Sequence, residues 1–167
     1  MSEDDIDRLI AGWARERPDL DLFPMSAVAR LLRAAGAVNA QLERTAREHG
    51  LQVPEGDVLF TLRRSGEPYR LQPSDLSAKL LVSSGTLTNR LDRLERKGLI
   101  ERIPHPTDRR STEVALTKKG FELADGVVAE HVESERRMLA GLSAAELERL
   151  DGLLRKLLAG FPGDGAR

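Results

Sequence analysis

Cysteine is absent from the 167 residues of this sequence, and histidine occurs only at positions 49, 105 and 131. The absence of thiols excludes a thiol-based redox switch and any metal centre ligated by cysteine. Three histidines this far apart in the sequence do not suggest a histidine metal cluster either. We therefore expect neither a resident metal nor any other cofactor.

The sequence also lacks an apolar run of membrane-spanning length, and its acidic N-terminus does not resemble a signal segment. The motifs of common enzyme classes are missing as well: there is no phosphate-binding glycine loop, no nucleophile elbow and no paired His and Cys. We therefore expect a cytoplasmic protein that is not an enzyme and does not associate with a membrane.

The net charge of −1 appears too low for a DNA-binding protein until it is divided along the chain. From Arg63 to Arg110 there are eleven Lys and Arg residues against six Asp and Glu, whereas the remainder holds fifteen against twenty-one. A local basic excess is the electrostatic feature by which phosphates are bound. The central part of the chain is therefore the candidate nucleic-acid interface.

A pair of short helices joined by a tight turn is predicted between positions 71 and 98. Pro73 can start the first helix, because proline is tolerated at a first helical position. Ser83 is a good N-cap for the second, and Gly98 follows its end, where a left-handed backbone is common. Leucines at helical spacing mark the buried sides: Leu76 and Leu80 in the first helix, and Leu87, Leu91 and Leu94 in the second. This pattern is typical of a helix-turn-helix whose second helix reads DNA.

The second of these helices has a leucine stripe and an opposite polar side. Small and hydrogen-bonding side chains near its start suit a major groove, which is read by the N-terminal half of such a helix. Arg90 instead flanks the leucine stripe and is expected to point partly back into the protein. The side chains expected to contact base edges or flanking phosphates are Ser83, Ser84, Thr86, Thr88, Asn89 and Arg93.

Two segments with strand character follow, over residues 99–103 and 111–116, and they enclose the proline-bounded loop PHPTDRR. We interpret them as a β-hairpin wing with a basic tip, formed by Asp108, Arg109 and Arg110, that contacts phosphates or the narrow minor groove. The alternative is that Arg109 and Arg110 belong to a solvated turn.

Longer amphipathic helices are predicted on both sides of this region. Their apolar stripes are too extensive to be covered by one small winged lobe, so a second copy of the chain is their expected cover. Thr117 caps the helix after the wing, and Ser143 with Glu146 forms a capping box for the last helix. The predicted spans are 4–14, 24–49, 53–64, 117–140 and a final leucine-striped helix closed by Gly160.

The segments VSSGTLTNRLDRLERKGLIER, P-x-D-R-R and VALTKKG together resemble the signature of the MarR family of winged-helix transcription regulators. The resemblance implies a mainly α fold with a small β-hairpin wing, dimerised through its N- and C-terminal helices. It also implies a homodimer that binds double-stranded DNA at a palindromic operator and is released by a small molecule or an oxidant. In one domain, residues 51–116 then form the winged helix-turn-helix lobe, 1–50 and 117–160 form dimerisation helices, and 161–167 form a tail. One departure is Gln72, where the family often has threonine; glutamine caps a helix less well.

Trp13, Asp57, Arg90 and Arg102 match the effector-binding tetrad of the urate-responsive branch of that family, the group of HucR, PecS and TamR. The resemblance implies a small organic anion such as urate as the effector that releases a repressor from DNA. A tricarboxylate, such as trans-aconitate or citrate, is the alternative effector. Each residue also has a plain structural interpretation: Trp13 fills a core, Asp57 favours a helix dipole, and the arginines contact phosphates.

A second class of function remains open at this stage. A winged helix can also serve as a protein-interaction module without specific DNA binding. A column of random duplex DNA distinguishes the two classes. A DNA-binding protein is retained less strongly as the salt concentration rises, because its binding releases counterions from the duplex, whereas a protein-interaction module is not retained in this way.

Overall fold

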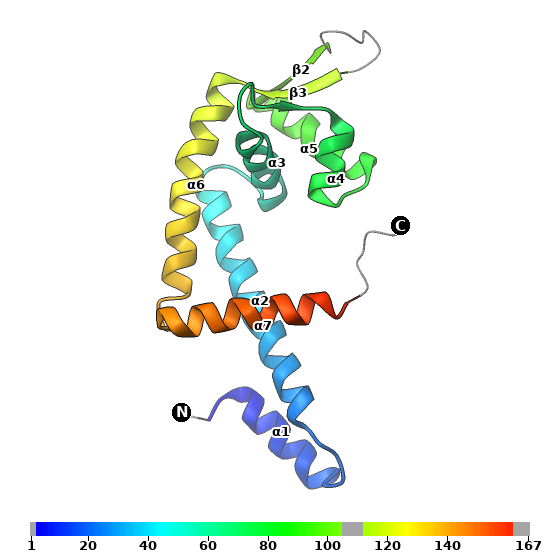
Figure 1. The fold of residues 1–167 in the computed structure, drawn as a ribbon, viewed down its shortest axis with the longest axis vertical. Coiled ribbons are helices and arrows are strands. Elements are labelled where there is room, and N and C mark those ends of the chain that lie inside the picture. The colour runs from blue at the N-terminus through cyan, green and yellow to red at the C-terminus, as the bar shows by residue number, and fades with distance from the viewer. Residues whose placement is uncertain (1–2, 105–111, 162–167) are drawn as a thin grey trace.

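A computed structural model of the chain describes residues 3–104 and 112–161. It is mainly helical, with a small three-stranded antiparallel sheet (Figure 1). The helices are α1 (Asp5–Glu16), α2 (Phe23–Glu48), α3 (Val53–Arg64), α4 (Pro73–Leu80), α5 (Ser84–Arg96), α6 (Lys118–Met138) and α7 (Ala144–Ala159). The strands are β1 (Arg70–Leu71), β2 (Ile100–Pro104) and β3 (Thr112–Leu116). The predicted mainly α fold with a winged helix-turn-helix is confirmed.

The compact lobe at one end of the molecule consists of α3, α4, α5 and the sheet (Figure 1). Its core is formed by apolar side chains from all of these elements, because each presents one apolar stripe or face to the others. The leucine stripe predicted for α5 is buried, and Leu76 of α4 packs with it. The core residues are Leu51, Val58, Leu59, Leu62, Leu76, Leu87, Leu91, Leu94, Leu99, Ile100, Val114 and Ala124.

The wing contains one strand that the sequence did not suggest. Residues 63–70, RRSGEPYR, have the glycine and proline of a loop, yet Arg70 and Leu71 pair antiparallel with Ala115 and Val114 of β3. This makes the strand order β1-β3-β2, with β3 in the centre. A strand of two residues is too short to show an alternation of apolar and polar side chains. It can be recognised only from the strand with which it pairs.

The ends of α5 are formed as its sequence predicts. The Ser83 hydroxyl accepts a hydrogen bond from the Thr86 backbone N–H at 3.3 Å, which satisfies one of the first N–H groups of the helix. At the other end, Gly98 has a φ of 68°, in the left-handed region that glycine enters without strain. The start of α4 differs, because Gln72 is its N-cap but makes no side-chain capping bond.

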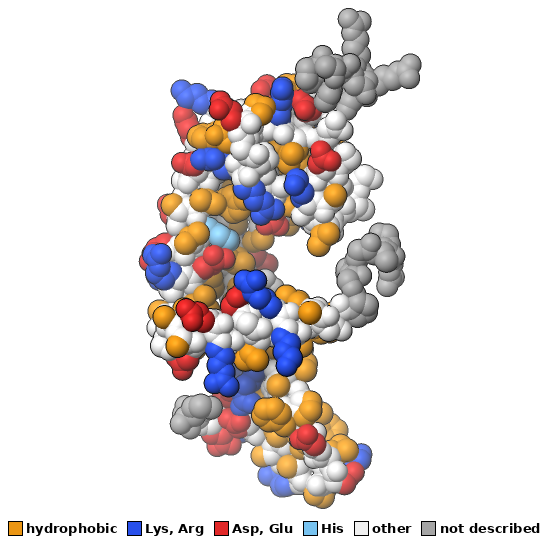
Figure 2. All heavy atoms as spheres, viewed as in Figure 1, with side chains coloured by type: hydrophobic (Ala, Val, Ile, Leu, Met, Phe, Trp, Pro, Cys, Tyr) orange, Lys and Arg blue, Asp and Glu red, His pale blue; other side chains and the backbone are white. Residues whose placement is uncertain are grey.

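Four helices lie largely outside the lobe. α2 and α6 run away from it, and α1 packs along α2 at the far end. In the view of Figure 1, α7 passes across α2. None of the residues of α1 or α7 is buried in this single chain. Figure 2 shows hydrophobic side chains gathered over α1 and the N-terminal half of α2. Among the described residues, no helix has the length and apolar character needed to cross a membrane.

Candidate nucleic-acid interface

The polar start of α5 is open to solvent, as expected for a surface that enters a DNA groove. All five of its predicted contact residues are exposed, namely Ser83, Ser84, Thr86, Thr88 and Asn89. Two of the hydroxyls also bond within the helix: Ser83 Oγ donates to Thr86 Oγ1 at 3.0 Å, and Thr88 Oγ1 donates to the Ser84 carbonyl oxygen at 2.9 Å. These bonds orient the hydroxyls and leave Asn89 facing solvent.

One flank of α5 carries positive charge and lies against α3. Glu55 of α3 is almost completely buried, with 1% of its surface exposed. Its Oε2 accepts from Lys97 Nζ at 2.6 Å and from the Gln52 backbone N–H at 2.8 Å. Its Oε1 lies 3.3 Å from Arg93 Nε. Burial by itself raises the pKa of Glu55, but the bonds from Lys97 and Gln52 and the charge of Arg93 outweigh it, so the pKa is lowered.

Arg93 was predicted to contact DNA; its Nε lies toward Glu55, and 38% of its side chain remains exposed. The position of Arg93 around the helix axis lies between the flank that contacts α3 and the polar side. Helical spacing alone therefore does not determine where its side chain points. Glu55 and Lys97 were not among the predicted site residues. Glu55 had only the signal of an acidic residue in a first helical turn, where the capping box with Gln52 is a sufficient explanation.

The opposite flank of α5 carries negative charge and lies against the wing. Arg102 of β2 donates to Asp92 at 2.6 Å and also to Glu95. These hydrogen bonds, above all the one that Arg102 donates to Asp92, raise the pKa of Arg102 above its ordinary value. Arg102, a member of the predicted tetrad, therefore pairs with the recognition helix itself.

Asp57 of α3 and Arg90 of α5 interact electrostatically, on the same flank of α5 as Glu55. Asp57 is solvent-exposed, but the atoms packed around its carboxyl displace part of its water, and this desolvation raises the pKa of the carboxyl. The charges of Arg90, His131 and Arg64 act in the opposite direction and do not cancel the effect. His131 of α6 also packs its ring against Phe60, with ring centroids 5.6 Å apart.

The predicted tetrad is not gathered within one chain. Trp13 lies on α1, at the end of the molecule opposite to the lobe, and 47% of it is exposed (Figure 1). Asp57 and Arg90 interact electrostatically on one flank of α5, and Arg102 is bound on the other. The tip of the wing, with Asp108, Arg109 and Arg110, lies outside the described residues.

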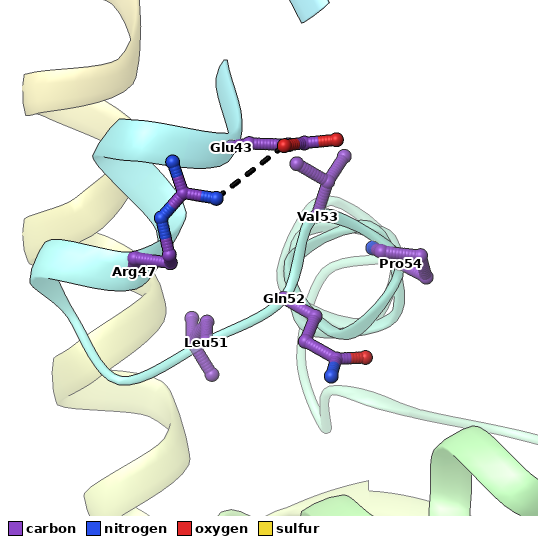
Figure 3. Close-up of a pocket in the computed structure, with 6 residues that line it drawn as sticks. All are labelled: Glu43, Arg47, Leu51, Gln52, Val53 and Pro54. Atoms are coloured by element: carbon purple, nitrogen blue, oxygen red, sulfur yellow. Dashed lines mark hydrogen bonds and ion pairs between the residues drawn. The ribbon is translucent and has the colours of Figure 1, made fainter. Parts of the chain in front are cut away.

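Two hollows lie beside the elements that hold α5. A pocket of about 380 Å³ lies at the junction of α2 and α3 and is lined by Leu51 and Gln52 (Figure 3). Arg47 and Glu43, which also line it, form an ion pair at 3.3 Å. A second hollow of about 620 Å³ lies between α4, α5 and β2, and Thr88, Asp92 and Arg102 contribute polar groups to it. No group of three His, Cys, Asp or Glu side chains in the described parts of the chain could hold a metal ion.

Comparison with known proteins places this arrangement in a family. A sequence profile of the MarR family matches residues 49–111. The HTH-type transcriptional regulator PecS of Dickeya dadantii is 40% identical over 153 residues, which is 92% of each chain. The crystal structure of AbsC, a MarR family transcriptional regulator from Streptomyces coelicolor, covers 84% of this chain and 95% of its own, with 28% identity and a TM-score of 0.75. A mutant of Escherichia coli MarR in complex with operator DNA covers 83% of this chain and 99% of its own, with 29% identity and a TM-score of 0.69.

Proposed function

The chain belongs to the MarR family of winged-helix transcription regulators, whose members are DNA-binding proteins and not enzymes, and from that premise we propose that it is a repressor released from its operator by a small organic anion. The observation that carries the DNA-binding part is the exposed polar start of a capped α5, next to a wing of three strands. A helix presented in this way fits the major groove, and the wing reaches the adjacent backbone.

We propose that the operator is bound by a homodimer. The unburied α7 and the exposed apolar side chains of α2, such as Val28 and Leu32, need a cover that a second copy can supply. Two recognition helices related by a two-fold axis then enter successive major grooves about 10 bp apart, so the operator is an imperfect palindrome. Footprinting that protects only a single half-site contradicts this arrangement.

The contacts divide into those that read bases and those that hold phosphates. Asn89, with Ser84 and Thr88, is proposed to touch groove edges, where an amide side chain can read adenine. Ser83 and Thr86 lie at the helix start and suit flanking phosphates. Asp108, Arg109 and Arg110 are proposed to dock the wing, with the arginines on the backbone or in the minor groove.

Salt titration distinguishes these roles. Arg110→Ala is expected to weaken binding to every duplex and to reduce the slope of log affinity against log salt by roughly one unit. Asn89→Ala is expected to lose discrimination between the selected operator and a scrambled duplex, with an unchanged slope. If Arg110→Ala binds as tightly as the parent protein at moderate salt, the wing assignment is wrong.

For the effector response, we propose that an organic anion such as urate competes with Asp57 for Arg90. The electrostatic attraction between Asp57 of α3 and Arg90 of α5 supports this, because an anion bound by Arg90 would repel the carboxylate and displace the recognition helix. Arg102 holds the other flank of that helix, so a shift of α5 must also strain its bonds to Asp92. Trp13 can join the same site only if a partner chain carries it to the lobe.

Trp13 is the only tryptophan, so its fluorescence reports on its own surroundings. We would titrate urate, trans-aconitate and citrate in separate experiments and repeat an operator gel shift with each. The proposal expects release by at least one anion, and loss of that release in Arg90→Ala and Asp57→Ala. About 1.4 kcal/mol of preference for the unbound arrangement is needed for each tenfold loss of DNA affinity. Release that survives both substitutions, with unchanged Trp13 emission, places the effector site elsewhere.

A further inference from the structure

The buried Glu55 stands where three segments meet at the C-terminal end of the recognition helix. Lys97 Nζ bonds both to its carboxylate and, at 2.9 Å, to the Gly50 carbonyl oxygen in the α2–α3 connection. From the other side, Lys119 Nζ of α6 donates to the Lys97 carbonyl oxygen at 2.9 Å. The end of α5 is therefore attached both to the segment that follows α2 and to the start of α6.

We propose that Glu55 is a positioning residue for DNA recognition: it holds Arg93 and Lys97 of α5 against the protein, so that the helix presents its polar start to DNA and not its C-terminal cations. This inference rests on the proposed function, because it concerns how the same helix chooses among DNA sequences. It adds a residue that does not itself touch DNA.

The geometry explains why a carboxylate is needed at this point. A buried charge is tolerated only when it is paired, and here one carboxylate faces two cations and one backbone N–H. Moving α5 away from α3 separates these charges, so the ion pairs restrain the helix. Glu55 Oε1 and Arg93 Nε are in ionic contact but make no hydrogen bond in the described part of the chain. The Lys97 bond, at 2.6 Å, is thus the firmer of the two attachments.

Arg96 provides the contrast within the same helix. It is exposed, lies opposite the leucine stripe, and its Nε bonds the Asp92 carbonyl oxygen of its own helix at 3.2 Å. Arg93 and Lys97 each keep 38% of the side chain exposed but direct a nitrogen to Glu55, whereas Arg96 bonds a backbone oxygen of its own helix, and we assign Arg96 to a phosphate. Cations that reach phosphates strengthen binding to DNA of any sequence. Keeping Arg93 and Lys97 away from the phosphates therefore lowers the affinity for unrelated sequences and favours discrimination between sequences.

The test compares two DNA probes: the duplex that the full-length parent protein enriches from a randomised library, and a scrambled duplex of the same length. Glu55→Gln keeps the shape and an oxygen for the Gln52 N–H but removes the charge. We expect the ratio of the two affinities to fall by about tenfold or more, and the salt slope on the scrambled duplex to steepen by about one to two units as the cations are freed.

Val58→Ala is the matched control, because it removes buried atoms from the same helix without changing charge. It is expected to lower the melting temperature and to leave the affinity ratio and the slope unchanged. If Glu55→Gln does the same, Glu55 has only a structural role and the inference is overturned.

Two further variants decide the matter if Glu55→Gln does not fold. Arg93→Gln and Lys97→Met each break one attachment, so both are expected to reduce the affinity ratio without flattening the salt slope of specific binding. Arg96→Gln is expected to flatten that slope by about one unit. A flattened slope in Arg93→Gln means that Arg93 contacts phosphate, which overturns the inference while leaving the proposed function intact. If the parent protein binds no duplex, both fall together.

Discussion

Leu81 adopts a backbone conformation that leucine rarely adopts. It ends α4 with φ 53° and ψ 44°, in the left-handed region, and 83% of the residue is exposed. Its side chain therefore gains little from burial to offset the steric strain of this conformation, which glycine avoids. The tight turn between the two helices of the DNA-binding motif requires this geometry whatever residue occupies it.

Leu81→Gly is accordingly expected to raise the free energy of unfolding by about 0.5–1 kcal/mol. The measurement is urea denaturation followed by circular dichroism. Lys79→Gly is the control, because Lys79 is helical and exposed, and glycine there is expected to destabilise by a similar amount. A loss of stability in Leu81→Gly indicates that the leucine is covered in the assembled protein.

The raised pKa of Asp57 predicts how the stability of the fold depends on pH. Its raised pKa means that the folded state binds the proton more tightly than the unfolded chain, so ionisation of Asp57 destabilises the fold. The penalty is absent well below the ordinary value of 3.8, grows as the pH rises above it, and is complete above the raised pKa. Asp57→Asn is therefore expected to melt at a higher temperature than the parent at neutral pH, with the difference vanishing in acid. A lower melting temperature at neutral pH shows that attraction to Arg90 outweighs the burial of the carboxylate.

At the scale of elements, the recognition helix is held between two oppositely charged neighbours. α3 presents Glu55 and Asp57 to its basic flank, and β2 presents Arg102 to its acidic flank. α6 closes the same lobe from outside, and Gly120 in its first turn lies directly against the backbone of Leu99. A Cβ on Gly120 would lie 1.8 Å from the Leu99 carbonyl oxygen. Only glycine permits this approach of α6 to the segment that follows α5.

Gly120→Ala is expected to destabilise the protein by about 3 kcal/mol, because two backbone segments must move apart to admit one methyl group. Gly126→Ala in the same helix is the control: nothing lies within 4 Å of an added Cβ there, and alanine is expected to be neutral or to stabilise by up to about 1 kcal/mol. Thermal unfolding of both variants compares them directly. Equal melting temperatures would show that α6 can shift without cost.

At the scale of the whole molecule, apolar side chains outside the lobe remain exposed to solvent in the single chain. α7 has no buried residue, and its Leu153 and Leu158 are 57% and 68% exposed. Apolar residues on one stripe of a helix that packs so little within its own chain are typical of an interface between subunits. We therefore assign this surface to the interface of the homodimer that is proposed to bind the palindromic operator.

Leu153→Glu is expected to shift the protein from dimer to monomer at micromolar concentration, because a charge buried in an apolar interface has no partner. Operator affinity should then fall at least tenfold, since two half-sites are no longer bound together. Glu148→Lys, on an exposed polar position of α7, is the control and should remain dimeric. Analytical ultracentrifugation measures the mass; a dimeric Leu153→Glu variant removes α7 from the interface.

The sequence by itself determined the helices, the two strands of the predicted hairpin and their order. The N-caps Ser83, Thr117 and Ser143 and the left-handed Gly98 appear where they were predicted, because a cap depends on residues within one turn. The buried leucine stripe of α5 followed from helical spacing in the same way. Such signals are local, so they survive without knowledge of the fold.

Only the tertiary structure decided which charges meet. Arg93 turned to Glu55, Arg102 to Asp92 and Glu95, and Trp13 came to lie at the far end of its own chain. The two-residue strand β1 likewise exists only through its partner β3. Each of these features depends on how elements that are distant in sequence are placed against one another. The direction of a long charged side chain on a helix flank follows the nearest opposite charge. The spacing of residues along that helix does not encode where this charge lies.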